Sequence, residues 1–594
     1  MEFELVIHNG TVLDGTGNPR FRADIGIGDG KITAISPKEH LDGKQKLDAT
    51  GLIVAPGFVD IHSHADLSLL QSPLAKNFIM QGVTTFLGGN CGMSMAPLGD
   101  NDRYTGVTLP GNLRGNVENI NWHTFGEWLS RVESNGMSMN YIPLVGHSAV
   151  RVAVMGEGFK RKATPAEIEA MKTHVEEAMQ SGAFGISSSF DPGPGEYATY
   201  EEIVELAKVA KKYGGLYTPH TRYHQESWIA DAPEIYGYGL MHGYKGEVIT
   251  GRYHGLIEAL EIAKSAQIRL LIAHLTPSYI LPQPQPEFLQ EAAAQATLLE
   301  IIDTPRERGV DVFFSVIAYT PSIGMPVKIL DSFFHPGLSR PEWMLDLSQD
   351  AFVENLKSEN FREKLRDWFF SGRFKFFMVH PAINPYWMDS FMVIRCRNKE
   401  YEGKIIGEIA RKKSPGRIVE TVYRASVDTV FDIISDDPEA TWGLNFDLRE
   451  NPGALRRFLQ HPNGIPCTDS FCMPDISDEV SLATHPPIAY GLFPHYLKEF
   501  VKEKKILTLE EAIMKATSLP ARIVLGLEDR GVLSPSAYAD IVVFDFEKIA
   551  MGGDFRTPAR PPTGIEYVLV NGEVTYAKMN HTGVKAGKVI RRQS

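Results

Sequence analysis

The chain has 594 residues, of which 43% are hydrophobic and 22% are charged, a composition typical of a globular protein long enough for more than one domain. Its 60 basic and 73 acidic residues give a formal net charge of −13 without any basic block, which argues against nucleic acid or a membrane as a partner. Four cysteines are too few for a disulfide framework, no apolar run reaches the roughly 18 residues that span a bilayer, and no secretion signal opens the chain, so we expect a cytoplasmic protein.

Both ends of the chain carry short segments with the alternating pattern of β-strands. Near the N-terminus, Asn9-Gly10 lies between two such segments and predicts a hairpin turn. Near the C-terminus, Asn571-Gly572 closes another. The predicted strands are residues 5–8, 11–14, 23–27, 31–35, 539–545 and 565–570. We therefore expect a small β-sandwich domain formed by residues 1–56 and 521–594.

The middle of the chain alternates strands with helices. One helix begins with Thr164 as N-cap, Pro165 at the first position and Glu167 completing a capping box. A second begins at Thr199 and stops before Gly214-Gly215. Eight strands are predicted, ending at His64, Cys91, Gly146, Ser189, His220, His274, Ser315 and Asp469. This alternation predicts an α/β fold, a (β/α)8 TIM barrel over residues 57–520.

The seventh and eighth predicted strands are too far apart for a plain barrel. Residues from about 321 to 440 therefore form a predicted insertion. The segment is rich in aromatic side chains, namely Phe333, Phe334, Trp343, Trp368, Phe369 and Trp387. They are interpreted either as a local hydrophobic core or as a lid that lines the substrate site.

Polar side chains gather where the predicted barrel strands end. His62 and His64 are two residues apart, so both project from one face of an extended strand. Taken alone, such a pair is commonly just hydrogen-bonded. Barrel enzymes, however, place their sites at the carboxyl ends of the strands, and six candidate ligands fall there. They are His62, His64, Cys91, His220, His274 and Asp469.

Imidazole and thiolate groups are the ligands that zinc prefers, and a catalytic zinc site keeps one position open for water. A water bound to such a metal has a pKa near 7 and is a hydroxide nucleophile at neutral pH. A nearby carboxylate is then needed to accept its proton and pass it to the leaving group. Asp469 is the candidate for this acid/base role.

With these residues in place, the chain resembles the amidohydrolase superfamily, and within it the N-acyl-D-amino-acid deacylase (D-aminoacylase) family. The resemblance covers most of the chain, the insertion excepted. The matching stretches are residues 55–64, 82–85, 89–94 (Gly-Asn-Cys-Gly-Met-Ser), 182–187, 519–522, 538–545 and 568–572.

The resemblance implies one or two zinc ions per subunit. The family's tight zinc site falls on Cys91, His220 and His274, and a second position falls on His62 and His64 together with Asp469, which is also the catalytic acid/base. The fourth strand has no lysine, so the carbamylated-lysine bridge of other amidohydrolases is not expected. The Cys91 thiolate takes that role.

Three positions depart from the family pattern. No lysine closely follows His274, an arginine is replaced near His485-Pro486-Pro487, and of the tyrosine motif after the seventh strand only Tyr319 remains. The missing groups are those that the resemblance assigns to the α-carboxylate of the substrate. Tyr319, His485 and Arg222 are the expected substrate-binding residues, with a structural ion pair as the alternative for Arg222.

Losing charged hydrogen bonds worth roughly 1.5–3 kcal/mol each weakens the binding of a free carboxylate. We therefore predict a zinc-dependent deacylase or amidase that cleaves a C–N bond in a neutral or bulky small-molecule amide. The alternatives are an N-acyl-D-amino acid deacylase proper or a hydrolase of cyclic amides, lactones or esters. A non-enzymatic scaffold is disfavoured, because it has no need of an open metal site. The oligomeric state is open, with a homo-oligomer as one option.

Overall fold

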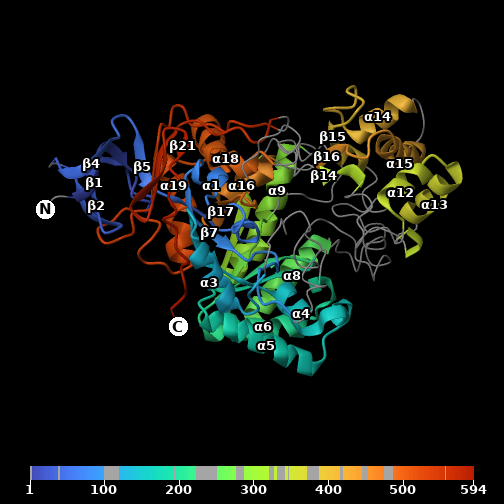
Figure 1. Ribbon diagram of the computed structural model, residues 1–594, viewed down its shortest axis with the longest axis horizontal. Helices are drawn as coiled ribbons and strands as arrows, with labels where there is room; N and C mark the ends of the chain where they lie inside the picture. Colours follow the sequence, from blue (N-terminus) through green and yellow to red (C-terminus); the bar gives the residue numbers. More distant parts are fainter. Residues whose placement is uncertain are drawn as a thin grey trace.

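The computed structural model describes residues 3–593 apart from 38–39, 100–119, 191–193, 223–250, 276–285, 320–326, 331–341, 345–346, 371–386, 415–418, 445–451, 474–485 and 555–556. Figure 1 shows strands of both chain ends at the left, mixed strands and helices in the middle, and the helices of the insertion at the right. No helix among the described residues is long and apolar enough to cross a membrane.

A nine-stranded sheet unites the two ends of the chain in the order β21-β20-β19-β18-β5-β1-β2-β3, with β4 paired to β1. The antiparallel pairing of β5 with β18 joins the N-terminal strands to the C-terminal ones, which lie side by side as blue and red arrows in Figure 1. The strands are β1 (Phe3–Val12), β2 (Phe21–Gly28), β3 (Lys31–Ser36), β4 (Gly43–Asp48), β5 (Ile53–Pro56), β18 (Ile541–Phe544), β19 (Ile565–Val570), β20 (Glu573–Ala577) and β21 (Asn580–His581).

The hairpin predicted at Asn9-Gly10 is wrong, because β1 runs through both residues as one strand. Asn9 adopts a φ of 61°, and the pairing with β2 shifts register there, so the dipeptide forms a bulge. The backbone amide of Asn9 donates to Asp24 Oδ1 at 2.9 Å, which holds the bulge in place. The same dipeptide at Asn571-Gly572 connects β19 to β20 as predicted.

The parallel strands form one sheet in the order β17-β13-β12-β11-β10-β9 and another in the order β6-β7-β8. The predicted strands of the middle region all have counterparts, with β8 and β9 sharing the third position. Their bounds are β6 (Phe58–Asp60), β7 (Val83–Gly88), β8 (Asn140–Pro143), β9 (Val145–Gly146), β10 (Gly185–Ser189), β11 (Leu216–His220), β12 (Arg269–Ile272), β13 (Val312–Ile317) and β17 (Gly464–Cys467).

Backbone hydrogen bonds link the two parallel sheets on both sides. On one side, β8 continues into β9 after a single residue, and the Phe184 amide donates to the Pro143 carbonyl at 2.7 Å. On the other side, the Asp469 amide donates to the His62 carbonyl at 2.9 Å. The segment that follows β17 therefore lies against the segment that follows β6.

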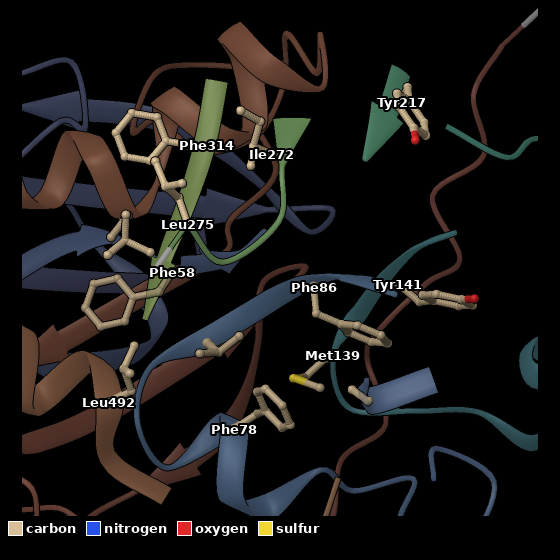
Figure 2. Close-up of a cluster of buried hydrophobic side chains, with 14 of the residues drawn as sticks. Phe58, Phe78, Phe86, Met139, Tyr141, Tyr217, Ile272, Leu275, Phe314 and Leu492 are labelled. Atoms are coloured by element: carbon tan, nitrogen blue, oxygen red, sulfur yellow. The ribbon is translucent and has the colours of Figure 1, made fainter. Parts of the chain in front are cut away.

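Both faces of the parallel strands are buried, as is usual for parallel sheets. In β12, Leu270 and Ile272 pack into a cluster shared with the helices, whereas Leu271 points into a separate cluster made of residues in or next to the parallel strands together with Leu519, Val524 and Leu525. Figure 2 shows part of the first cluster, in which the rings of Phe86 and Tyr141 stack with centroids 4.9 Å apart. The second, the strand cluster, includes Ile61, Leu87, Ile142, Leu144, Phe184, Leu216, Leu271, Phe313 and Ile465.

The helices around these strands follow the predicted start signals. At α5, the Thr164 side chain accepts from the Glu167 amide and Pro165 occupies the first turn. At α6, the Thr199 side chain accepts from the Glu202 amide. The helices are α1 (Lys76–Ile79), α3 (Phe125–Asn135), α4 (His147–Met155), α5 (Pro165–Gln180), α6 (Tyr200–Lys212), α8 (Gly251–Ala266), α9 (Glu287–Leu298), α10 (Thr304–Glu307), α16 (Pro452–Gln460), α18 (Ile488–Tyr496) and α19 (Leu509–Ala516).

The segment between β13 and β17 has its own hydrophobic core, made of residues from 329 to 442. Phe369 is buried in it and Trp368 packs against it, which supports the local-core interpretation for these two, whereas Trp343 is 48% exposed. Phe333, Phe334 and the Trp387 side chain lie outside the described residues. The elements are β14 (Val327–Lys328), α12 (Gln349–Asn355), α13 (Glu359–Phe370), β15 (Phe391–Arg395), α14 (Ile406–Lys413), α15 (Val419–Asp436) and β16 (Thr441–Leu444).

A buried polar network fastens the terminal sheet to the parallel strands. The Asp540 carboxylate pairs with the Arg530 guanidinium and accepts from the side-chain amide of Asn140, the first residue of β8. Asn571 donates to Asn140 Oδ1 at 2.8 Å and accepts from Arg530 at 2.8 Å. Because the side chains of Arg530 and Asp540 are only 4% and 5% exposed, their charges depend on each other.

Replacing Asp540 by alanine leaves the Arg530 guanidinium buried without its carboxylate. We expect Asp540→Ala to lower the free energy of unfolding by about 3–5 kcal/mol, the usual cost of breaking a buried pair. Urea denaturation followed by circular dichroism measures it. The control is Asp42→Ala, whose partner Lys46 is exposed, and which should leave the midpoint nearly unchanged. Equal midpoints for the two variants would contradict the prediction.

Candidate metal centre

Five of the six predicted ligands come together through their side-chain donor atoms around Cys91. The Cys91 Sγ atom lies 3.4 Å from His62 Nε2, 3.4 Å from His274 Nε2 and 3.6 Å from His220 Nδ1. His220 Nδ1 and His274 Nε2 are 3.1 Å apart. His62, His64 and Cys91 form a further group in which every donor atom lies within 4.8 Å of the others.

These separations can be compared with those around a tetrahedral zinc ion. Bond lengths of about 2.3 Å to sulfur and about 2.0–2.1 Å to nitrogen place sulfur about 3.6 Å from nitrogen and two nitrogens about 3.3 Å apart. The observed sulfur–nitrogen distances of 3.4–3.6 Å and the nitrogen–nitrogen distance of 3.1 Å agree within a few tenths of an ångström. The donor set of Cys91, His220 and His274 therefore fits zinc.

The sixth predicted ligand, Asp469, completes the arrangement from the end of β17. Its Oδ1 atom lies 3.4 Å from His62 Nε2 and 3.2 Å from His64 Nε2. The side chains of His62 and His64 are 0% and 6% exposed, whereas that of Asp469 is 28% exposed. The carboxylate is therefore the member of the cluster that an incoming molecule can reach.

Three of these residues have left-handed backbone conformations, with φ of 50° at Cys91, 33° at His274 and 52° at Asp469. Such angles are uncommon for residues other than glycine and concentrate at functional sites. Each residue lies just beyond the end of its strand. The backbone turn redirects the side chain toward the shared centre instead of letting it follow the strand.

Glycines allow the loop that carries Cys91 to pack directly against the chain of β8 and β9. A Cβ atom on Gly89 would lie 2.1 Å from the carbonyl oxygen of Leu144, and one on Gly146 would lie 2.4 Å from that of Gly92. Only residues without a side chain permit this approach. The thiol thereby crosses from the end of β7 to a point near β11 and β12.

Burial controls the charge of the ring and thiol donors. It lowers the pKa of His62, and lowers that of His274 well below its ordinary value, so both imidazoles are neutral and able to bind a metal. Burial, reinforced by the charge of Asp469, raises the pKa of the Cys91 thiol well above its usual range. A bound cation reverses this, because a thiol that coordinates a metal is deprotonated.

Asp469 behaves in the opposite way. Burial alone would raise its pKa, but the hydrogen bonds from His62 and His64 outweigh that effect and hold the pKa well below its ordinary value. The carboxylate is therefore ionised at neutral pH and able to accept a proton.

Arg222, predicted to bind substrate, lies in a two-pronged pair with Glu258. Its Nε and Nη2 atoms donate to the two carboxylate oxygens at 2.9 and 3.1 Å. The remaining guanidinium contacts include the carbonyls of Glu196 and Ala198, and the guanidinium lies over the Phe190 ring. These contacts favour the structural ion pair over a role in binding a substrate anion.

Of the other two predicted substrate-binding residues, the structure describes only Tyr319. Tyr319 is buried just after β13, and its ring meets that of His495 of α18 edge-on with centroids 5.0 Å apart. Burial lowers the pKa of His495 to about 4, so the tyrosine faces a neutral ring. His485 lies outside the described residues.

Asp60 has a role at the centre that the sequence analysis did not assign. Its carboxylate accepts from the amide and hydroxyl of Thr468 and from the amide of His62 at 3.3 Å. Burial raises its pKa to about 7 against these hydrogen bonds. Asp60 thus ties the two segments that carry His62 and Asp469. The two-residue spacing of Asp60, His62 and His64 along the chain was the sequence signal that could have assigned Asp60 to the site.

A model of the amidohydrolase family matches residues 45–320 and 476–576, which make up more than half of the chain. The chain belongs to the amidohydrolase family. This confirms the resemblance drawn from the sequence motifs. The unmatched stretch contains the insertion and also Asp469, so the assignment of that residue depends on its geometry.

The amidohydrolase is similar to two deacylases along its whole length. It is 27% identical over 591 residues to a D-aminoacylase of Alcaligenes xylosoxydans xylosoxydans, with 99% of this chain and 98% of that protein covered. It is 28% identical over 600 residues to an N-acyl-D-glutamate deacylase of the same organism, with 100% and 97% covered.

Solved structures show the same likeness. An N-acyl-D-glutamate deacylase from Bordetella bronchiseptica, complexed with zinc and a phosphonate inhibitor, matches with a TM-score of 0.68 and 25% identity over the full length of both chains. A D-aminoacylase structure matches with a TM-score of 0.68 and 24% identity, covering 99% of this chain and 100% of the other. The fold is thus that of the D-aminoacylase group of amidohydrolases.

We expect Cys91→Ala to remove most of the metal that the amidohydrolase retains after dialysis, because it deletes the donor on which the cluster converges. Metal per protein chain is measured by atomic emission. The matched control is Cys396→Ala, since Cys396 is also buried but lies in the insertion. Wild-type metal content in Cys91→Ala would show that this thiol is not a ligand.

Proposed function

We propose that this amidohydrolase is a zinc-dependent deacylase or amidase that cleaves the C–N bond of a small-molecule amide. One observation carries the proposal: the buried donors of Cys91, His220 and His274 have the mutual spacing of zinc ligands and adjoin the partly exposed carboxylate of Asp469. The whole-length similarity to D-aminoacylase and N-acyl-D-glutamate deacylase supports the same reaction class.

We infer that the parallel strands close into a (β/α)8 barrel that forms residues 57–520. The hydrogen bonds that link the two parallel sheets on both sides, and the strand cluster enclosed between them, support this closure. Residues 1–56 and 521–594 then form the small β domain, and the segment near 321–440 is an insertion with its own core. The catalytic groups occupy one end of the barrel.

We assign the tight zinc position to Cys91, His220 and His274. A second, looser position is assigned to His62 and His64 with Asp469, which gives one or two zinc ions per subunit. The closeness of His62 Nε2 to both Cys91 Sγ and Asp469 Oδ1, at 3.4 Å each, supports adjacent positions. When bound, zinc supplies Lewis-acid activation of a water molecule and of the scissile carbonyl.

The chain's own residues perform the proton transfers. Asp469 takes a proton from the attacking water and delivers it to the leaving nitrogen, which must be protonated before the C–N bond breaks. His62 and His64 hold the carboxylate through Oδ1, which assigns the proton transfer to Oδ2. The buried surroundings strengthen these interactions, because the local dielectric is low.

The specificity that we propose is for an amide without a free α-carboxylate. Arg222 is engaged by Glu258, and the sequence lacks the lysine and arginine that would bind such a group. A second candidate is hydrolysis of N-acyl-D-amino acids themselves. The relatives that match along the whole chain, a D-aminoacylase, an N-acyl-D-glutamate deacylase and an N-acyl-D-aspartate deacylase, favour it.

We expect Asp469→Asn to retain zinc through Cys91, His220 and His274 but to lower kcat by several orders of magnitude, since the proton acceptor is lost. Steady-state kinetics and metal analysis on the same preparation measure both quantities. Near-normal turnover with a full complement of metal would show that another group transfers the proton.

A substrate panel separates the two specificities. N-acetyl-D-amino acids are compared with the corresponding N-acetyl-D-amino acid amides, which carry a neutral carboxamide in place of the charged α-carboxylate. We expect kcat/KM to be higher for the neutral amides. A preference for the acids would support the second candidate and would require an anion-binding group elsewhere in the pocket.

A further inference from the structure

The left-handed backbone at Cys91 and His274 must be held by its surroundings, because the conformation is unfavourable for residues that carry a Cβ atom. In both cases a buried serine on another strand makes the hydrogen bonds that hold the turn. Neither serine is a candidate metal ligand, and neither was singled out for its side chain by the sequence motifs.

The first of these is Ser187 in the middle of β10. Its hydroxyl donates to the Gly89 carbonyl and accepts from the Gly92 amide at 2.9 Å. Gly89 and Gly92 flank Cys91, so one hydroxyl group bridges the two ends of the turn that presents the thiol. Ser187 is fully buried, which leaves water no access to replace these hydrogen bonds.

The second is Ser315 in β13, the strand beside the one that leads to His274. Its Oγ atom accepts from the His274 amide at 2.7 Å, and its carbonyl accepts from the Leu275 amide at 2.8 Å. Two consecutive amides of the left-handed turn are thus fixed to one residue. Ser315 is also fully buried.

We propose that Ser187 and Ser315 are positioning residues of the metal centre, holding the turns at Cys91 and His274 so that the Sγ and Nε2 atoms stay at the separation a zinc ion requires. This inference rests on the proposed metal site. Without the hydroxyls, the amides of Gly92 and His274 lose their buried acceptor and the turns can relax toward commoner backbone angles. The donor atoms, 3.4 Å apart in the structure, then lose their preset spacing.

Ser188 provides a matched control on the same strand. It is equally buried, but its side chain points to the other face of β10, where its hydroxyl lies 2.8 Å from the Tyr217 hydroxyl. Ser188→Ala therefore removes the same atom from the same strand without touching either turn. Any loss of metal affinity specific to Ser187→Ala or Ser315→Ala reflects the turns rather than general packing.

The test measures zinc affinity by competition with a chromophoric chelator in full-length wild type, Ser187→Ala, Ser315→Ala and Ser188→Ala. We expect a loss of roughly ten- to a hundredfold in the first two variants, the usual effect of removing groups that orient metal ligands. The cobalt-loaded proteins should show shifted visible absorption bands in the same two variants. Ser188→Ala should match wild type in both measurements.

A second pair, Ser187→Thr and Ser315→Thr, restores the hydroxyl and should restore the affinity. Wild-type affinity and cobalt bands in both alanine variants, or an equal loss in Ser188→Ala, would overturn the proposal. If wild-type protein itself binds no metal, the proposed function fails instead, so the two failures are distinguishable.

Discussion

A buried thiol surrounded by imidazoles from other strand ends is the constraint on which this molecule depends. Thiol and imidazoles all lie beyond the reach of bulk water, so none can carry an unpaired charge at low cost. Burial keeps the His62 and His274 rings neutral and the thiol protonated until a cation arrives. Without metal the thiol and these rings are therefore uncharged. Together with the ionised Asp469 carboxylate they are complementary to a divalent cation, and the fold has to hold them at that spacing.

The residues proposed to bind the metal and the residue proposed to transfer protons differ in exposure to solvent. Cys91, His220 and His274 are enclosed, whereas the Asp469 side chain keeps more than a quarter of its surface accessible. The carboxylate is also the group whose charge the surrounding histidines stabilise. An ionised, partly exposed carboxylate beside the proposed metal position is the arrangement that hydrolysis needs, and it arises because β17 ends where the segment after β6 passes.

Much of this could be predicted from the sequence because the relevant signals are local. The strand that ends at His220 and the strand that ends two residues before His274 follow from short apolar runs, and the helix beginning at Pro165 follows from its capping residues. What could not be predicted depends on residues distant in the chain. Asn9-Gly10 forms a bulge because Asp24 captures its amide, while Arg222 finds its partner on a helix beyond the segment after β11. No local pattern specifies either contact.

The pairing of β5 with β18 has a consequence for how the protein is made. Pro56 and Ile541 are partners in that ladder, yet almost the whole chain separates them. At synthesis rates of roughly 5–20 residues per second, β5 emerges from the ribosome about 25–100 s before its neighbour exists. During that time, one edge of a nascent hydrophobic sheet has unpaired backbone groups able to associate with other chains. Completion of the terminal sheet is thus a late event in biogenesis, and a truncated chain lacking its last strands would carry that edge permanently.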